Sequence, residues 1–114
     1  MTWYQRSGSK YNSRRTEYHG TIYQSKKEAQ YAFDLDMLKN AGEIKDWKRQ
    51  FKLDLRVNGE HIANYYVDFW VLQNDGREEL HEVKSQITMT DTWRIKWRLT
   101  EVLFGDKYKL VVIK

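Results

Sequence analysis

The 114-residue sequence contains no cysteine, so the protein has neither a disulfide framework nor a thiolate metal site. No apolar run approaches the length of a membrane-spanning helix, and the first residues lack the apolar core of a signal peptide. Gly-rich phosphate-binding loops and the ligand spacing of zinc sites are absent as well. We therefore expect a soluble, cytoplasmic protein that makes no membrane contact.

Aromatic side chains, in contrast, are plentiful, with five Trp, eight Tyr and four Phe. Aromatic residues bury large areas in a core, and they also stack on nucleic-acid bases and anchor protein interfaces. The length of the chain corresponds to one domain built around one hydrophobic core. Some of the aromatic residues are therefore candidates for a binding surface.

Positive charge is concentrated near the N-terminus, where residues 1–27 contain six basic side chains and one acidic side chain. The net charge of the whole chain is +4, so the remainder is close to neutral. This asymmetry indicates an arm or face that meets a polyanion such as DNA. A solubilising tail has the same composition, and charge alone does not distinguish the two.

Local patterns divide the chain into an arm and a domain. Residues 1–15 are polar with little periodicity, which predicts a flexible basic arm followed by a single domain over residues 16–114. Within that domain, residues 17–23 can form a small hairpin around His19-Gly20.

The first helix has clear start and stop signals. Ser25 and Glu28 have the spacing of a capping box, which predicts a helix that runs to about Asn40 and stops at Gly42. Apolar residues follow Glu28 at helical spacing, so Glu28 lies on the stripe that faces the core.

Three strands and a second helix follow. Alternation predicts a strand over residues 51–57, and Asn58-Gly59 is a strong hairpin signal that leads to a strand over residues 61–72. A third strand covers residues 79–85, which completes an antiparallel meander. Thr90 or Asp91 caps a helix over residues 92–104 that ends at Gly105, and a last strand over residues 108–113 runs parallel to the third. The fold class is α/β, in the order α-β-β-β-α-β, with a mixed four-stranded sheet flanked by helices.

The most informative pattern is an acid, a turn, and a second acid followed two residues later by lysine. Residues 74–76, Asn-Asp-Gly, suit a three-residue hairpin loop with glycine in the left-handed position. A loop centred on its aspartate places Asp68 directly opposite Glu82, with Cβ atoms about 5 Å apart. Lys84 emerges on the same face of its strand as Glu82, whereas His81 points to the opposite face.

Two opposed carboxylates repel each other and destabilise a sheet unless something offsets the charge. A hard divalent cation does so, because Mg²⁺ takes oxygen ligands that commonly include one or two carboxylates and a phosphate. A solvent-facing ion pair between Glu82 and Lys84, with Asp68 near an exposed edge, is the simpler structural explanation. That explanation is weakened by the apolar run of residues 65–71 around Asp68, since an acid there is costly unless it is paired or liganded.

Glu28 is a candidate third acid. If the first helix presents its core-facing stripe to the sheet, Glu28 points toward Asp68 and Glu82. Glu28 also has a structural role available as the glutamate of the capping box. The two roles do not exclude each other.

Glu28, Asp68 and Glu82-Val83-Lys84, in this order of elements, resemble the PD-(D/E)xK nuclease superfamily, whose core is restriction-endonuclease-like. Residues 25–29, 41–44 and 66–69, together with Gln50, look more specifically like small phage-encoded endonucleases related to Holliday junction resolvases. The resemblance covers about residues 10–114. The sequence departs from it at Tyr66-Val67, where the name of the motif has proline.

The resemblance implies a role for each residue of the motif. Asp68, Glu82 and the main-chain carbonyl of Val83 would bind Mg²⁺, for which Mn²⁺ can substitute, and Glu28 would bind it directly or through water. Lys84 would position or activate the water that attacks the phosphodiester, leaving a 5′-phosphate and a 3′-hydroxyl. The implied function is a structure-selective DNA endonuclease, in particular a Holliday junction resolvase in the cytoplasm of a phage host. A nuclease that nicks DNA or cuts flaps or forks, and an inactive DNA-binding module of the same fold, remain alternatives.

Five basic residues are candidate DNA contacts. Lys26 and Lys27 lie in the first turn of a helix, where backbone amides already attract anions. Cations slightly disfavour that end of a helix, which suggests a purpose other than helix stability. Arg14 and Arg15 belong to the basic arm. Lys96, on the edge of the second helix, either reaches the site or the DNA backbone, or is an ordinary exposed lysine.

The second helix has two apolar faces. We expect one of them to pack on the core, namely Ile95, Leu99, Val102 and Leu103. The other face, Trp93, Trp97 and Phe104, can be core, a base-stacking platform or a dimer surface. We favour a dimer surface, because a two-fold homodimer suits an enzyme that cuts two strands of a four-way junction symmetrically.

Overall fold

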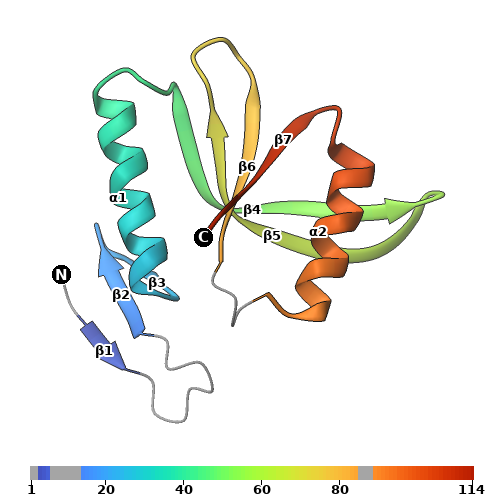
Figure 1. The fold of residues 1–114 in the computed structure, drawn as a ribbon, viewed down its shortest axis with the longest axis horizontal. Helices are drawn as coiled ribbons and strands as arrows, with labels where there is room; N and C mark the ends of the chain where they lie inside the picture. Colours follow the sequence, from blue (N-terminus) through green and yellow to red (C-terminus); the bar gives the residue numbers. More distant parts are fainter. Residues whose placement is uncertain (1–2, 6–13, 85–88) are drawn as a thin grey trace.

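The computed structural model describes residues 3–5, 14–84 and 89–114, and for residues 3–5 and 14 only the backbone is described. Within these ranges the chain forms two sheets and two helices (Figure 1). The small sheet contains β1 (Trp3–Gln5), β2 (Arg14–Tyr18) and β3 (Thr21–Tyr23). The main sheet contains β4 (Asp46–Val57), β5 (Glu60–Leu72), β6 (Glu78–Val83) and β7 (Tyr108–Ile113), and the helices are α1 (Lys26–Asn40) and α2 (Asp91–Phe104).

The main sheet is mixed. Strands β4, β5 and β6 pair antiparallel in chain order, and β7 returns through α2 to pair parallel with β6. The predicted order α-β-β-β-α-β and the mixed four-stranded sheet with two helices are therefore confirmed. The expected end of the third strand, at Ser85, lies outside the described residues.

The two helices cover opposite faces of the main sheet (Figure 1). On one face, Ala32 and Leu35 of α1 pack with Phe69 in one hydrophobic cluster. On the other face, Trp97 of α2 packs with Leu80 in a second cluster. Removal of this apolar surface from water is the main contribution that holds the layers together.

Both ends of α1 follow the signals in the sequence. Ser25 Oγ accepts a hydrogen bond from the Glu28 amide at 3.1 Å, which satisfies one free donor of the first turn. Gly42 has a left-handed φ of 76°, and the Glu43 amide donates to the Leu38 carbonyl at 2.8 Å, as in a Schellman motif. Among the described residues, no helix has the length and apolar character needed to cross a membrane.

The two predicted hairpin turns of the main sheet are confirmed. Asn58 and Gly59 have φ angles of 53° and 80°, the left-handed pair that a two-residue turn between strands requires. Gly76 has a φ of 89° and ends the three-residue loop 74–76, which the hydrogen bond from the Gln73 amide to the Arg77 carbonyl closes at 2.8 Å. Because loop length fixes the pairing of the flanking strands, this second turn sets which residues of β5 and β6 face each other.

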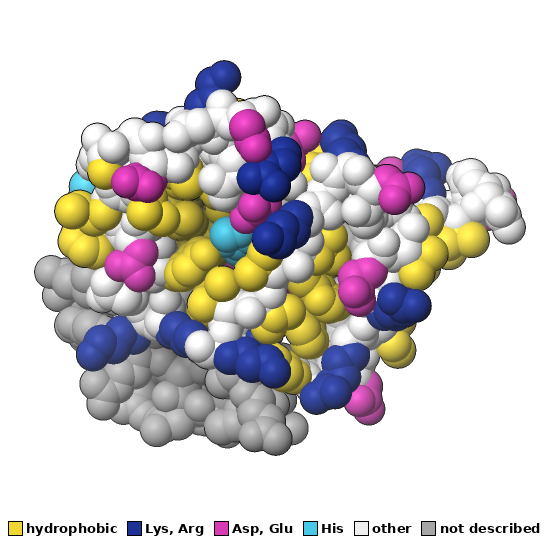
Figure 2. All heavy atoms as spheres, turned by 45° about the horizontal axis from the view of Figure 1, so that its top comes forward, with side chains coloured by type: hydrophobic (Ala, Val, Ile, Leu, Met, Phe, Trp, Pro, Cys, Tyr) yellow, Lys and Arg dark blue, Asp and Glu magenta, His cyan; other side chains and the backbone are white. Residues whose placement is uncertain are grey.

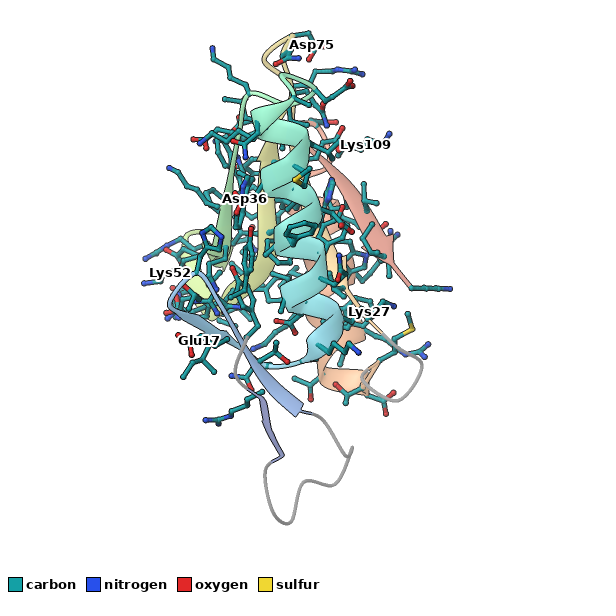
Figure 3. The ribbon with its side chains drawn as sticks, turned by 90° about the vertical axis from the view of Figure 1, so that its left-hand side faces the viewer. Glu17, Lys27, Asp36, Lys52, Asp75 and Lys109 are labelled. Atoms are coloured by element: carbon teal, nitrogen blue, oxygen red, sulfur yellow. The ribbon has the colours of Figure 1, made fainter. Side chains whose placement is uncertain are left out.

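The small sheet contains the hairpin predicted around His19 and Gly20, with Thr16 paired to Tyr23. Strand β1 and the first residues of β2 fall within residues 1–15, the segment expected to be a flexible arm, so part of that segment is paired as strand. Asp36 connects the small sheet to the main one through α1 (Figure 3), because it accepts hydrogen bonds from the Tyr18 hydroxyl at 2.6 Å and the Trp47 indole at 2.9 Å.

The main sheet bends where Gln50 of β4 lies opposite Asp68 of β5. Gln50 has a left-handed φ of 51°, which is uncommon outside glycine. Before the bend, Phe69 packs toward α1, and beyond it Val67 packs toward α2, although the two are only two residues apart on one strand. The alternation of a straight strand is therefore interrupted at Asp68, which lies half-buried where the two hydrophobic clusters meet.

The expected orientation of α2 is wrong. Trp97 is buried, and Trp93 and Phe104 pack against the same cluster, so the face expected to form a dimer surface is the core face. Ile95, Val102 and Leu103, expected in the core, are 68%, 66% and 37% exposed, whereas Leu99 packs against the cluster as expected. The larger aromatic side chains bury more apolar area than the aliphatic ones, which favours the observed orientation.

Candidate active site

The predicted register between β5 and β6 is confirmed. Phe69 pairs with His81 and Trp70 with Leu80, so the preceding residue, Asp68, faces Glu82. The Asp68 amide donates to Glu82 Oε1 at 3.3 Å. In return, the Val83 amide donates to Asp68 Oδ2 at 2.8 Å. The two carboxylates are thus held beside each other by the backbone of the neighbouring strand.

Glu28 brings a third carboxylate to this region from the first turn of α1. Burial raises its pKa to about 7, and the charge of Asp68 adds to that shift, while Lys84 and Arg49 act against it. Glu28 is half-buried, and the charges of Asp68, Lys84 and Arg49 all act on it, so its carboxylate lies within electrostatic range of these residues. Glu28, Asp68 and Glu82 are called the acidic cluster below.

Glu82 is the most deeply buried member of the acidic cluster, with 1% of its surface exposed. Burial is the main reason that its pKa rises to about 8, and the charge of Asp68 is the second. Burial likewise raises the pKa of Asp68. A carboxylate in such surroundings is costly unless it is protonated, paired or bound to a cation. The cluster therefore favours a proton or a cation between its members.

Lys84 lies beside the acidic cluster, as the spacing of Glu82 and Lys84 predicts. Its Nζ is 3.8 Å from Glu82 Oε2 and 5.3 Å from the centroid of the Trp93 ring. Lys27 approaches from α1, where its Nζ donates to the Lys84 carbonyl at 3.2 Å. Figure 3 shows Lys27 at the N-terminal end of α1, far from the hairpin loop with Asp75. The candidate site thus lies where the starts of α1 and α2 meet the end of β6.

Two further residues, Tyr65 and Trp93, hold Glu82 in place, and the sequence predicts neither role. The Tyr65 hydroxyl donates to Glu82 Oε1 at 2.5 Å, and the Trp93 indole donates to the Tyr65 hydroxyl at 2.9 Å. Burial, followed by the charge of Glu82, strongly raises the pKa of Tyr65, so it stays a donor. No sequence signal marks this chain of hydrogen bonds, because it depends on how α2 docks on the sheet.

The remaining predicted DNA-binding residues, other than Lys27, differ in how exposed they are. Lys96 is half-buried on α2, and in the described part of the chain it forms no ion pair. Arg15 is half-buried in β2. Lys26 is exposed in the first turn of α1, next to Lys27. The side chain of Arg14 lies outside the described part of the structure.

His81 does not join the acidic cluster, as its position in the strand predicts. Its Nδ1 lies 2.6 Å from the Tyr31 hydroxyl of α1, and its Nε2 lies 2.8 Å from Glu79 Oε1. These contacts are on the face of the sheet that α1 covers. Burial lowers the pKa of His81, so the ring is neutral at neutral pH.

The donor set of the acidic cluster consists of carboxylate oxygens, which suit Mg²⁺ or Mn²⁺ rather than a softer metal. In the ranges that the structure describes, no three His, Cys, Asp or Glu side chains are arranged to hold a metal ion. The crowding of Asp68 against Glu82, with raised pKa values for both, is the observation that fits a divalent cation. Such a cation would stabilise the charged forms that burial disfavours.

Comparison with known proteins identifies one family. Residues 8–114 match the family model described as "Protein of unknown function (DUF1064)". No curated protein and no solved structure matches the chain. The match covers nearly the whole sequence, and the chain therefore belongs to the DUF1064 family, whose description states no function.

Proposed function

We propose that this protein is a Mg²⁺-dependent, structure-selective DNA endonuclease of the PD-(D/E)xK type. The observation that carries the proposal is the pair Asp68 and Glu82, whose carboxylates lie side by side in a largely buried position, with Lys84 next to them. A buried pair of like charges destabilises a fold, so its presence favours a catalytic or metal-binding role. The third carboxylate, Glu28, supports the same proposal.

Asp68 and Glu82 would hold the metal ion, with Glu28 and the Val83 carbonyl as further oxygen ligands. When bound, Mg²⁺ supplies positive charge that favours deprotonation of water and offsets negative charge on a phosphate. The Lys84 ammonium, positioned by Glu82 and the Trp93 ring, can donate a hydrogen bond to the attacking water and orient it. Tyr65 keeps Glu82 Oε1 occupied, which leaves Oε2 to face Lys84 and the metal ion.

Several basic side chains support DNA as the substrate. Lys27 borders the site directly, and Lys26 lies beside it in the same helical turn. On the face drawn in Figure 2, Lys and Arg side chains lie along the lower edge of the described surface and also at its centre, top and right, interspersed with acidic side chains. Arginine and lysine contacts to phosphates supply most of the affinity of proteins for DNA without defining its sequence. This arrangement suits recognition of DNA shape.

A Holliday junction is the substrate that we propose first, and a homodimer is the form that would cut it symmetrically. The test is incubation with Mg²⁺ and a panel of labelled DNAs that contains a four-way junction, a flap, a fork, a linear duplex and a single strand. Paired cuts near the junction centre are expected. Preferential cutting of the flap or fork would redirect the substrate assignment, and binding without cleavage in Mg²⁺ or Mn²⁺ would refute the nuclease.

The same assay with Asp68→Asn tests the assignment of the site. The asparagine keeps the size of the side chain and removes its charge, so we expect loss of cleavage with junction binding largely kept. Asp106→Asn, a change of the same chemistry at an exposed position after α2, is the matched control. Cleavage by Asp68→Asn at the wild-type rate would show that the chemistry takes place elsewhere.

A further inference from the structure

Arg49, on β4 next to the bend at Gln50, is a further cation near the acidic cluster, and no sequence pattern indicates its position. Its guanidinium carbon lies 4.9 Å from the centroid of the Tyr23 ring. Its charge also acts on Glu28 and Asp68, so the guanidinium lies within electrostatic range of the acidic cluster. The ring of Tyr23, buried in β3, holds it in this place.

Despite these neighbours, Arg49 forms no ion pair in the described part of the chain, and its Nε is buried without a hydrogen-bond partner. Arg56 and Arg77 behave differently, since each donates Nε to an aspartate two residues away, at 2.7 Å and 2.6 Å. Buried donors in folded proteins are rarely left unpaired. The unsatisfied Nε therefore indicates that the guanidinium has an acceptor outside the described residues.

The missing partner must be a hydrogen-bond acceptor other than the carboxylates of the acidic cluster. A guanidinium presents planar, paired donors that match phosphate oxygens, and stacking on an aromatic ring leaves those donors free. A phosphodiester that approaches the acidic cluster would otherwise meet uncompensated negative charge. Arg49 stands between that cluster and the small sheet, where Arg15 also has a buried Nε without a partner.

We propose that Arg49 binds a backbone phosphate of DNA beside the acidic cluster. This contact would align the DNA strand between the candidate site and the small sheet. The proposal rests on the proposed function, because it takes DNA as the ligand. Phosphate binding by Arg49 differs from a purely structural role, in which Arg49 would only neutralise neighbouring carboxylates. A structural role predicts no change in the number of phosphates that the protein contacts.

The test is the salt dependence of binding to a labelled four-way junction, measured in EDTA so that no cleavage occurs. Loss of one phosphate contact lowers the slope of log K against log salt concentration by about 0.9. We expect this change for Arg49→Gln, with affinity reduced by about tenfold near 0.1 M salt. Arg49→Lys keeps the charge and is expected to keep the slope, while binding more weakly than wild type.

Lys48→Gln is the matched control, because Lys48 is the adjacent cation and its Nζ lies over the Trp70 ring at 5.1 Å, away from the acidic cluster. It should keep the wild-type slope. Arg49→Met serves as a second neutral variant if thermal denaturation shows that Arg49→Gln is unfolded. An unchanged slope in the folded neutral variant would overturn the proposal.

The outcomes separate the two proposals. A reduced slope in a protein that cleaves no DNA would support the phosphate contact and refute the nuclease. Cleavage by wild-type protein together with an unchanged slope for Arg49→Gln would support the nuclease and refute the phosphate contact. Absence of any binding to DNA would overturn both.

Discussion

The Tyr65 hydroxyl of β5 donates to Glu82 Oε1 of β6 across 2.5 Å, inside the layer between the sheet and α2. This contact joins the hydrophobic cluster under α2 to the acidic cluster, because Tyr65 is itself a buried member of the former. A buried carboxyl group that loses its donor keeps the cost of desolvation. The stability of the fold and the arrangement of the candidate site are therefore linked at this pair.

Tyr65→Phe removes the hydroxyl while it keeps the ring. We expect the free energy of unfolding to fall by about 1–3 kcal/mol, because Glu82 and the Trp93 indole both lose a partner. Urea denaturation followed by Trp fluorescence measures the change. Tyr66→Phe is the control, since Tyr66 is 51% exposed, and should alter stability by less than about 0.5 kcal/mol. Equal effects of the two substitutions would contradict the buried contact.

The acidic cluster predicts that the metal-free protein loses stability as pH rises. Burial, followed by the charge of Asp68, raises the pKa of Glu28 to about 7 and that of Glu82 to about 8. A folded-state pKa above the unfolded one means that the native state holds protons that the unfolded chain has released. That contribution is complete below about pH 4 and is lost as pH rises through the folded pKa values.

Urea denaturation in EDTA between pH 5 and pH 8 measures this dependence. We expect the free energy of unfolding to fall by roughly 2–4 kcal/mol across the range. Glu82→Gln should flatten the curve and make the protein more stable at pH 8 than wild type. Glu60→Gln, at an exposed position of β5, should leave the curve unchanged. Superimposable curves for wild type and Glu82→Gln would show that Glu82 is ionised at little cost.

The orientation of α2 is tested by truncation of one residue on each of its faces. Trp97 is 9% exposed and packs under the helix, so Trp97→Ala should cost about 3–5 kcal/mol. Ile95 is 68% exposed, and Ile95→Ala should change the free energy of unfolding by less than about 0.5 kcal/mol. Chemical denaturation of both variants at one protein concentration distinguishes the faces. A larger loss for Ile95→Ala would restore the orientation expected from sequence.

The orientation of α2 could not be predicted from the sequence, whereas other features of the fold could. The length of the Asn-Asp-Gly loop determines which residues of β5 and β6 pair, and Ser25 with Glu28 marks the start of α1. Both features could therefore be predicted from a few adjacent residues. The choice between the two apolar faces of α2 depends on the shape of the sheet beneath it. That shape includes the bend at Gln50, which neither composition nor residue spacing predicts.

The same limit applies to the neighbours of the acidic cluster. Asp68, Glu82 and Lys84 could be found because a short hairpin and a single strand bring them together. Arg49 and Tyr65 could not, because their proximity to the cluster arises from the twist of long strands and from contacts with Tyr23 and with α2. Local geometry reveals the carboxylates, whereas tertiary packing supplies the groups around them.

Binding of Mg²⁺ should stabilise the protein through Asp68 before any DNA is added. A ligand that binds only the native state adds about 1.4 kcal/mol at a free concentration about tenfold above its dissociation constant. We expect this gain for wild type at pH 8, and a smaller gain at pH 6, because the metal ion must displace protons from Glu28 and Glu82. Thermal denaturation over a Mg²⁺ titration measures it. Asp68→Asn should abolish the gain and Asp106→Asn should keep it, so an equal gain in Asp68→Asn would place the cation outside the acidic cluster.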